Sequence, residues 1–238
     1  MILPGMMKPD FPPLLSGKSV AARVDPFDKA LAEVLTDEVT PGLIHYAENE
    51  DTLRAAITLA PEQGLADAVG VIFAVQLGLT DALGALGPPE VALHFTWPGG
   101  LKVNGASCGG FRAAADTMNP DAEPAWLIVG IDVPLAMQNQ GGLTPDQTTL
   151  FNEGCVELTT PGILESWSRH MLNWIHIYLS EGFAPLHEAW RGRCDAIGTE
   201  ITTPETGLFV GLDERGGMLL RQGAETKIIP LTTILEVR

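Results

Sequence analysis

Apolar residues recur at the spacing of an α-helix over residues 65–86. The positions that follow this period are Leu65, Val69, Ile72, Phe73, Leu79, Leu83 and Leu86. The stretch is long enough to cross a membrane, but it contains Asp67, Gln76 and Asp81 and ends at two prolines. The pattern therefore favours a central helix that is buried against a sheet.

Shorter apolar runs on either side of this helix are typical of β-strands. They are GLIHY at 42–46, VALHFTW at 91–97 and AWLIVGIDVPL at 125–135. The last run is almost continuously apolar, which favours a strand covered on both faces. Between the second and third runs, Asn104-Gly105 separates two short alternating segments, and this dipeptide is typical of a two-residue hairpin turn.

A second helix is predicted from Thr160, the expected N-cap, with Pro161 as its first helical residue and Gly182 after its end. Its apolar stripe, expected to be core, comprises Leu164, Trp167, Met171, Trp174, Ile175 and Tyr178. After Trp190 the pattern changes to short strands at 207–212, 218–222, 226–231 and 233–237. These strands predict a small β-barrel that is separate from the main domain.

The chain is therefore expected to divide into three parts, with an α+β fold. Residues 1–24 form an extended arm, because four prolines interrupt the apolar run that a signal peptide needs, and a cytoplasmic protein is expected. Residues 25–194 form the main domain, and residues 195–238 form the barrel. A length of 238 residues and a hydrophobic content of 45% suffice for a buried core.

Charge and composition exclude several function classes. The 14 Lys and Arg residues against 30 Asp and Glu give a net charge of −16, which repels phosphates, so nucleic acid is not an expected partner. Because residues 65–86 are expected to be a buried helix, no membrane is expected as a partner either. Five histidines lack the spacing of a helical metal site, so no metal is expected. The odd number and wide spacing of Cys108, Cys155 and Cys194 favour core thiols. Common nucleotide-binding and hydrolase motifs are absent.

Four segments carry a family resemblance. The stretch TWPGGLKVNGASCGGF at 96–111 resembles the adenylate-binding hairpin of biotin protein ligases, and VGIDVPL at 129–135 is similar to that family's Gly-rich strand. The segments 185–198 and 207–222 are similar to the family's last helix and SH3-like terminal domain. The resemblance covers roughly residues 25–238. It implies a mixed-sheet biotin/lipoate ligase-like catalytic domain followed by a small SH3-like β-barrel.

The family's chemistry implies ligands and partners for this chain. Its members use ATP and Mg to activate the carboxylate of biotin or lipoate, and then transfer the acyl group to a lysine of a carrier protein. The resemblance thus implies a small carboxylic acid, ATP with Mg, and an acyl or biotin carrier protein. It assigns ligand binding to Trp97, Pro98, Asn104, Gly105, Ser107, Gly109, Gly110, Arg112, Gly130 and Asp132.

Several charges that this chemistry needs are missing. The segment 48–63 corresponds to a Gly- and Arg-rich loop of the family, yet Arg54 is its single cation and thus its only nucleotide-binding candidate. The family's catalytic lysine position is Ser107. Such donors raise rates but are not needed for folding. The sequence leaves two functions open, a divergent ligase that attaches or activates a small acid and a catalytically inactive binding or regulatory module.

Lys102 is the candidate catalytic residue. If Asn104-Gly105 is the two-residue turn, Lys102 lies directly across from Ser107, with Cβ atoms about 5 Å apart. A lysine stem can span that gap and replace the missing catalytic lysine. The alternative is an exposed lysine that protects an edge strand from pairing with another chain.

Overall fold

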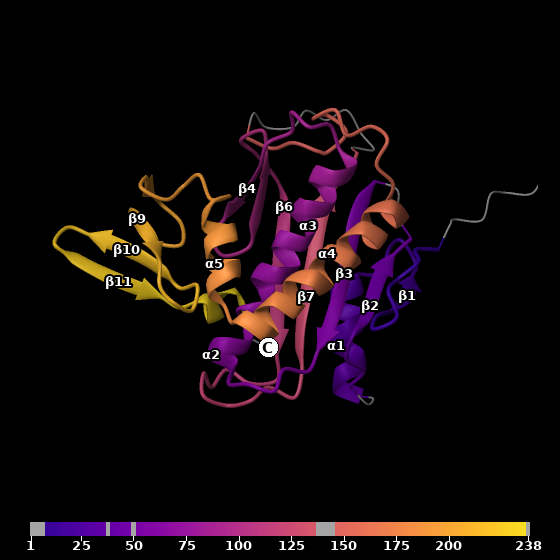
Figure 1. Cartoon of the computed structure of the whole chain (residues 1–238), viewed down its shortest axis with the longest axis horizontal. Helices are drawn as coiled ribbons and strands as arrows, with labels where there is room; N and C mark the ends of the chain where they lie inside the picture. Colours follow the sequence, from indigo (N-terminus) through magenta and orange to yellow (C-terminus); the bar gives the residue numbers. More distant parts are fainter. Residues whose placement is uncertain (1–7, 37–38, 49–50, 137–145, 237–238) are drawn as a thin grey trace, which may run out of the picture.

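The computed structural model describes residues 8–36, 39–48, 51–136 and 146–236, which form a large sheet, covering helices and a small second sheet (Figure 1). The large sheet has the strand order β1-β2-β3-β7-β6-β5-β4. Strands β1 and β2 pair in parallel and the other neighbours pair antiparallel, so the sheet is mixed as predicted. Its strands are β1 (Ser16–Val20), β2 (Leu43–Ala47), β3 (Thr52–Leu59), β4 (Leu93–Thr96), β5 (Gly100–Val103), β6 (Ala106–Ala115) and β7 (Leu127–Pro134).

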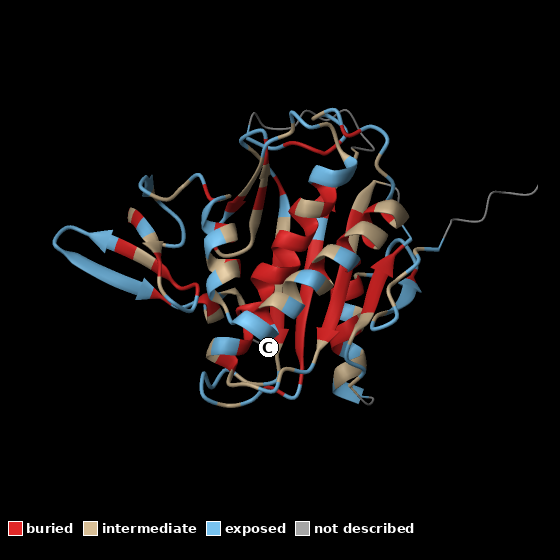
Figure 2. Ribbon diagram, viewed as in Figure 1, coloured by how far each residue is buried: buried red, intermediate tan, exposed pale blue. Residues whose placement is uncertain are grey.

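Helices cover one face of this sheet and bury most of the core (Figure 2). They are α2 (Leu65–Ala68), α3 (Val71–Leu86), α4 (Thr160–Glu181) and α5 (Ala184–Arg191). The helix expected at 65–86 is present and buried, in two pieces. By length and hydropathy alone this stretch could span a membrane, but 78% of its most apolar window is buried inside the fold. Helix α1 (Pro26–Thr36) packs on the opposite face in a smaller apolar cluster.

Close packing between α3 and α4 forms the centre of the core. Gly78 lies so near the backbone of Met171 that a Cβ atom there would be 2.7 Å from Met171 N and Cα. The indole of Trp167 donates a hydrogen bond to the carbonyl of Val75 over 3.2 Å. The apolar stripe predicted for the second helix is therefore confirmed as core, with Trp174 and Ile175 packed at its margin.

The start of α4 differs by one residue from the prediction. Thr159, and not Thr160, is the N-cap, since its side chain accepts a hydrogen bond from the amide of Gly162 and its backbone is extended. Thr160 is instead the first helical residue and Pro161 the second. Gly182 ends the helix with a φ of 82°, as expected from the preference of that conformation for glycine.

The expectation of a loop at 48–63 is wrong, because residues 52–59 form β3 in the middle of the sheet. This strand pairs with both β2 and β7. Apolar side chains on both of its faces, such as Ala56 and Ile57, are buried and hide the polar–apolar alternation of an ordinary strand. Residues 49–50 of this segment lie outside the described residues.

The C-terminal part forms a four-stranded antiparallel sheet in the order β11-β10-β9-β8. Its strands are β8 (Glu200–Ile201), β9 (Gly207–Leu212), β10 (Met218–Gln222) and β11 (Glu225–Ile229). The predicted fold class, an α+β ligase-like domain with a small C-terminal β domain, is thereby confirmed. Part of the predicted arm is itself structured, because Ser16–Val20 form the edge strand β1; residues 1–7 of the arm lie outside the described residues.

The strand predicted at 233–237 is wrong. Residues Leu231–Ile234 form a 3-10 helix, η1, and Leu235 makes an isolated parallel bridge with Ala113 of β6. The turn of helix places Leu231 and Leu235 in the core together, at 3% and 4% exposure. The end of the described chain thus returns to the main sheet. Residue 237 lies outside the described residues.

Candidate functional site

Six of the predicted site residues lie on the sheet face that α3 and α4 do not cover. Side chains alternate between the two faces of a strand. Leu101 and Ile131 belong to the core on the helix side, so the neighbouring Lys102 and Asp132 lie on the opposite face. The same reasoning places there Arg54, Ser107, Arg112 and Gly130. We call this surface the polar sheet face.

The hairpin predicted around Asn104-Gly105 is confirmed in its register. Asn104 and Gly105 have φ angles of 49° and 89°, Val103 pairs with Ala106, and Lys102 pairs with Ser107. The Lys102 side chain is 32% exposed, and its Nζ lies 3.5 Å from Oδ2 of Asp195. The lysine therefore lies directly across from Ser107, with a carboxylate of its own chain nearby.

On the other side of β5, Lys102 pairs with His94 of β4, so His94, Lys102 and Ser107 form a row across three strands. The Nδ1 atom of His94 is buried and has no hydrogen-bond partner among the described residues. The backbone of Ser107 is bonded to residues 146 and 148, which extend the sheet beside β6. Its side chain remains exposed.

Arg112 lies farther along β6 and contacts two carboxylates. Its Nη2 is 2.5 Å from Oδ2 of Asp25, and its Nη1 is 3.6 Å from Oε1 of Glu236. The guanidinium also stacks over the ring of Phe27, 4.2 Å from its centroid. Asp25 is positioned by the start of α1, where its Oδ1 accepts a hydrogen bond from the amide of Phe27.

Arg54 and Asp132 are direct neighbours in the middle of the polar sheet face. Arg54 donates a hydrogen bond to the carbonyl of Ala22, while its buried Nε has no partner among the described residues. Although Asp132 is exposed, the surrounding residues partly desolvate its carboxyl group and raise its pKa. Arg54 and Arg112 oppose this rise, and Asp25 adds to it. Arg54 is therefore fixed in a strand and not carried on a loop that could close over a nucleotide.

The glycines of the predicted site serve the backbone. A Cβ at Gly109 would lie 2.0 Å from the carbonyl oxygen of Asp132, and one at Gly110 would lie 2.3 Å from that of Gly99. At Gly130, a Cβ would lie 2.7 Å from the ring of Phe27. These positions therefore need glycine for strand and helix packing whether or not a ligand binds.

Trp97, Pro98 and Asn104 also make contacts within the protein. Trp97 is 4% exposed, and its Nε1 donates to the carbonyl of Gly216 over 2.9 Å. The carbonyl of Pro98 accepts a hydrogen bond from the buried side chain of Gln76. Asn104 bonds to the backbone of Ala92 and, through Nδ2, to Glu153. These three residues hold the hairpin in place.

Sequence reasoning missed the carboxylates that surround the cations, namely Asp25, Asp195 and Glu236. Only Asp25 had a local signal, since an aspartate directly before Pro26 is typical of a helix N-cap followed by proline. Asp195 and Glu236 are distant in sequence from Lys102 and Arg112. Nothing in their own segments indicates those contacts.

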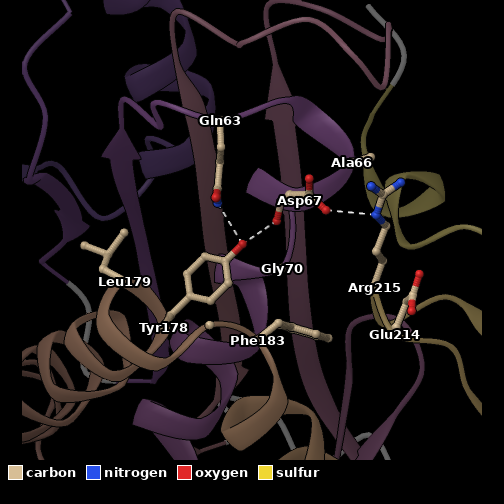
Figure 3. Close-up of a pocket in the computed structure, with 10 residues that line it drawn as sticks. Gln63, Ala66, Asp67, Gly70, Tyr178, Leu179, Phe183, Glu214 and Arg215 are labelled. Atoms are coloured by element: carbon tan, nitrogen blue, oxygen red, sulfur yellow. Dashed lines mark hydrogen bonds and ion pairs between the residues drawn. The ribbon is translucent and has the colours of Figure 1, made fainter.

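A cavity of about 340 Å³ lies elsewhere, between α2, the end of α4 and the turn after β9 (Figure 3). Four of its polar residues are connected: Gln63 donates to the hydroxyl of Tyr178, that hydroxyl donates to the carbonyl of Asp67, and the Asp67 carboxylate pairs with Arg215 at 2.9 Å. The cavity is thus a junction between the helices and the C-terminal sheet. It contains none of the predicted site residues.

The described residues of the polar sheet face do not fit ATP with Mg²⁺. Its three cations, Lys102, Arg54 and Arg112, face four carboxylates, Asp25, Asp132, Asp195 and Glu236. Such an arrangement repels a triphosphate. In the described part of the chain, no three His, Cys, Asp or Glu side chains are grouped as metal ligands would be.

Comparison with known proteins finds similarity to biotin protein ligases. A biotin ligase for acetyl-CoA carboxylase from Paracoccus denitrificans is 26% identical over 186 residues, which cover 75% of this chain and 77% of that protein. A biotin protein ligase-like protein of unknown function from Silicibacter sp. TM1040 has a structure with a TM-score of 0.91 and 44% identity, over 97% of this chain and 100% of that one.

More distant structures share the fold. Biotin protein ligase from Aquifex aeolicus, solved with biotin and ATP, has a TM-score of 0.69 at 18% identity, over 89% of this chain and 95% of that one. Residues 198–237 match a domain of unknown function, DUF4444. Residues 11–192 match the model of the Biotin/lipoate A/B protein ligase family. The chain therefore belongs to the Biotin/lipoate A/B protein ligase family.

Proposed function

We propose that this protein binds a small carboxylic acid on the polar sheet face, as a divergent family member in which Lys102 contacts the ligand carboxylate. The observation that carries this proposal is the register that pairs Lys102 with Ser107. The pair places an ammonium group within reach of the position that a lysine occupies in the family. Biotin, lipoate and related acids are the first ligands to test.

The electrostatics of the face favour binding over ATP-dependent catalysis. Arg112 is held by Asp25 and Glu236, and Arg54 lies within a strand beside Asp132. Lys102 is the least committed of the three cations, since its only described ion pair spans 3.5 Å and its side chain is a third exposed. A single ligand carboxylate can pair with Lys102. The three phosphates of ATP would need several cations, and Arg54 and Arg112 already lie beside carboxylates of the protein.

Isothermal titration calorimetry with biotin, lipoate, octanoate and longer acids tests the binding proposal. We expect Lys102→Ala to weaken the affinity for the bound acid about 10- to 100-fold, because a hydrogen bond to a charged group contributes about 1.5–3 kcal/mol. Lys227→Ala is a matched control, since Lys227 is also a strand lysine paired with a carboxylate, Glu205, at 2.6 Å. Equal affinity of wild type and Lys102→Ala would refute the role of Lys102.

A divergent ligase is the second candidate function, and the position of Lys102 opposite Ser107 favours it. In that case the protein would activate the acid with ATP and Mg²⁺ and attach it to a carrier protein. ATP–pyrophosphate exchange in the presence of the acid panel separates the two functions. We expect no exchange with any acid and millimolar or no affinity for ATP, whereas exchange with one acid would establish the ligase.

A further inference from the structure

Two carboxylates from residues after α5 reach the polar sheet face and lie beside its cations. Asp195 lies 3.5 Å from Lys102, and Glu236 lies 3.6 Å from Arg112. The two come from opposite ends of the C-terminal part of the chain. Each cation therefore already has a carboxylate of this chain where an anionic ligand would bind.

Both ion pairs are loose. Their distances exceed the 2.6 Å of Lys227–Glu205 and the 2.9 Å of Arg215–Asp67, and about a third of each side chain is exposed. Exposed pairs of this kind contribute about 0–1 kcal/mol. A ligand carboxylate can therefore replace Asp195 at Lys102, or Glu236 at Nη1 of Arg112, at small energetic cost, while Nη2 of Arg112 stays on Asp25.

The backbone that carries the two carboxylates is fixed, so that only the side chains need to move. Leu235 is buried, and the amide of Glu236 donates to the carbonyl of Ala113 over 2.8 Å. At the other end, the carbonyl of Arg193 accepts a hydrogen bond from Phe95 of β4, and Cys194 is buried. Asp195 and Glu236 are thus held near their cations by neighbouring residues.

The two cations mark the ends of one strip on the sheet. Lys102 of β5 pairs with Ser107 of β6, and Arg112 lies farther along β6. At about 3.3 Å per residue along a strand, the Cα atoms of Lys102 and Arg112 are roughly 15 Å apart. Gly110 and Asp132 lie between them. The strip is accessible, since Ser107, Gly109 and Asp132 are exposed.

We infer that the ligand of this face is an elongated acid with an anionic group at each end, and that it displaces Asp195 from Lys102 and Glu236 from Arg112. This inference rests on the proposed acid-binding function. The simplest ligands of this class are linear dicarboxylates. Asp195 and Glu236 compete with the ligand for the two cations, so an acid with one anionic group binds more weakly than an acid with an anionic group at each end.

Calorimetry with linear diacids and with monoacids of matched length tests the ligand class. We expect a diacid to bind at least tenfold more tightly than the monoacid, and the double variant Asp195→Asn/Glu236→Gln to bind that diacid up to about tenfold more tightly than wild type. Equal affinity for the two acid classes overturns the two-ended ligand. Equal affinity of wild type and double variant overturns the competition.

A readout without any ligand separates this inference from the proposed function. Acetic anhydride labels Lys102 and phenylglyoxal labels Arg112, and mass spectrometry measures both rates. In the double variant Lys102 should react several-fold faster, and Arg112, which keeps its contact with Asp25, should react faster by a smaller factor. Glu205→Gln should affect only Lys227.

If no acid binds, the proposed function and this inference both fail, even where labelling rises. If an acid binds but monoacids bind as tightly as diacids, the proposed function stands and only this inference fails. Unchanged labelling overturns the competition whatever the acids do.

Discussion

At the scale of single residues, the carboxylate of Glu33 contacts three basic side chains. Glu33 of α1 lies 2.7 Å from Lys18, 3.0 Å from Lys29 and 3.0 Å from the buried His45. Burial alone raises the pKa of Glu33, but the two lysines and His45 outweigh it and lower the pKa to about 2. The ionised carboxylate therefore ties α1 to strands β1 and β2.

Glu33→Gln should lower the free energy of unfolding by about 1–2 kcal/mol at pH 7, after allowance for solvent screening of the half-exposed lysines. Because the folded pKa lies below the unfolded value near 4.5, this stabilisation is present above pH 4.5 and is lost as the pH falls toward 2. Urea unfolding at pH 7 and pH 3 measures the difference. A difference that does not shrink at pH 3 contradicts the assignment, and exposed Glu225→Gln is the control.

Gly109→Ala should destabilise the protein by about 3 kcal/mol or more, because Gly109 has a φ of 77° and its Cβ would lie 2.0 Å from the carbonyl oxygen of Asp132. Gly223→Ala is a matched control: Gly223 also has a positive φ, 64°, but faces open space. It should cost only about 1 kcal/mol. Thermal unfolding compares the two, and similar losses would show that the clash is relieved.

At the scale of elements, α3 and α4 depend on small residues for their close approach. A hydrophobic helix alone would pack at about 8–10 Å between axes, and Gly78 removes the side chain where the backbone of Met171 lies closest. The helix also carries the buried Gln76, whose Oε1 accepts from Trp190 and whose Nε2 donates to Pro98. This helix thus supports the hairpin that bears Lys102.

Gly78→Ala should lower the free energy of unfolding by about 1–3 kcal/mol, because the added methyl group must push α4 away from α3. Gly84→Ala in the same helix has nothing within 4 Å and should stabilise by about 0.5–1 kcal/mol through helix propensity. Denaturant unfolding of both variants provides the comparison. Stabilisation by both substitutions would mean that the helices tolerate separation at this point.

At the scale of the whole molecule, the C-terminal sheet is joined to the main sheet by specific polar contacts. Trp97 at the hairpin donates to Gly216 in the turn before β10, and Glu236 bonds to Ala113 of β6. Phe209 and Met218 belong to the same buried cluster as α3. The small sheet therefore shares its core with the main sheet.

Trp97→Phe should retain most of the buried ring but leave the Gly216 carbonyl without its partner, at a cost of about 1–3 kcal/mol. Amide hydrogen exchange should then accelerate in β9 and β10. Trp126→Phe, in the cluster beneath α1, is the control and should leave exchange in those strands unchanged. Equal exchange in the two variants would show that the Trp97 contact does not hold the small sheet.

The sequence by itself determined the features that depend on near neighbours. Periodicity located the buried helix at 65–86, Asn104-Gly105 located the hairpin, and both followed from local backbone preferences. It also placed Lys102 opposite Ser107, because a two-residue turn sets the register of the strands. The family resemblance rested on the same hairpin.

Only the tertiary structure decided the contacts between distant segments. Arg54 lies in the central strand β3, which the sequence did not predict. Both faces of β3 are buried, and burial on two faces removes the polar–apolar alternation by which a strand is recognised in a sequence. The pairs Lys102–Asp195 and Arg112–Glu236 join residues far apart in sequence. Such contacts arise from the folding of the sheet and the return of the chain through Leu235, which no local pattern encodes.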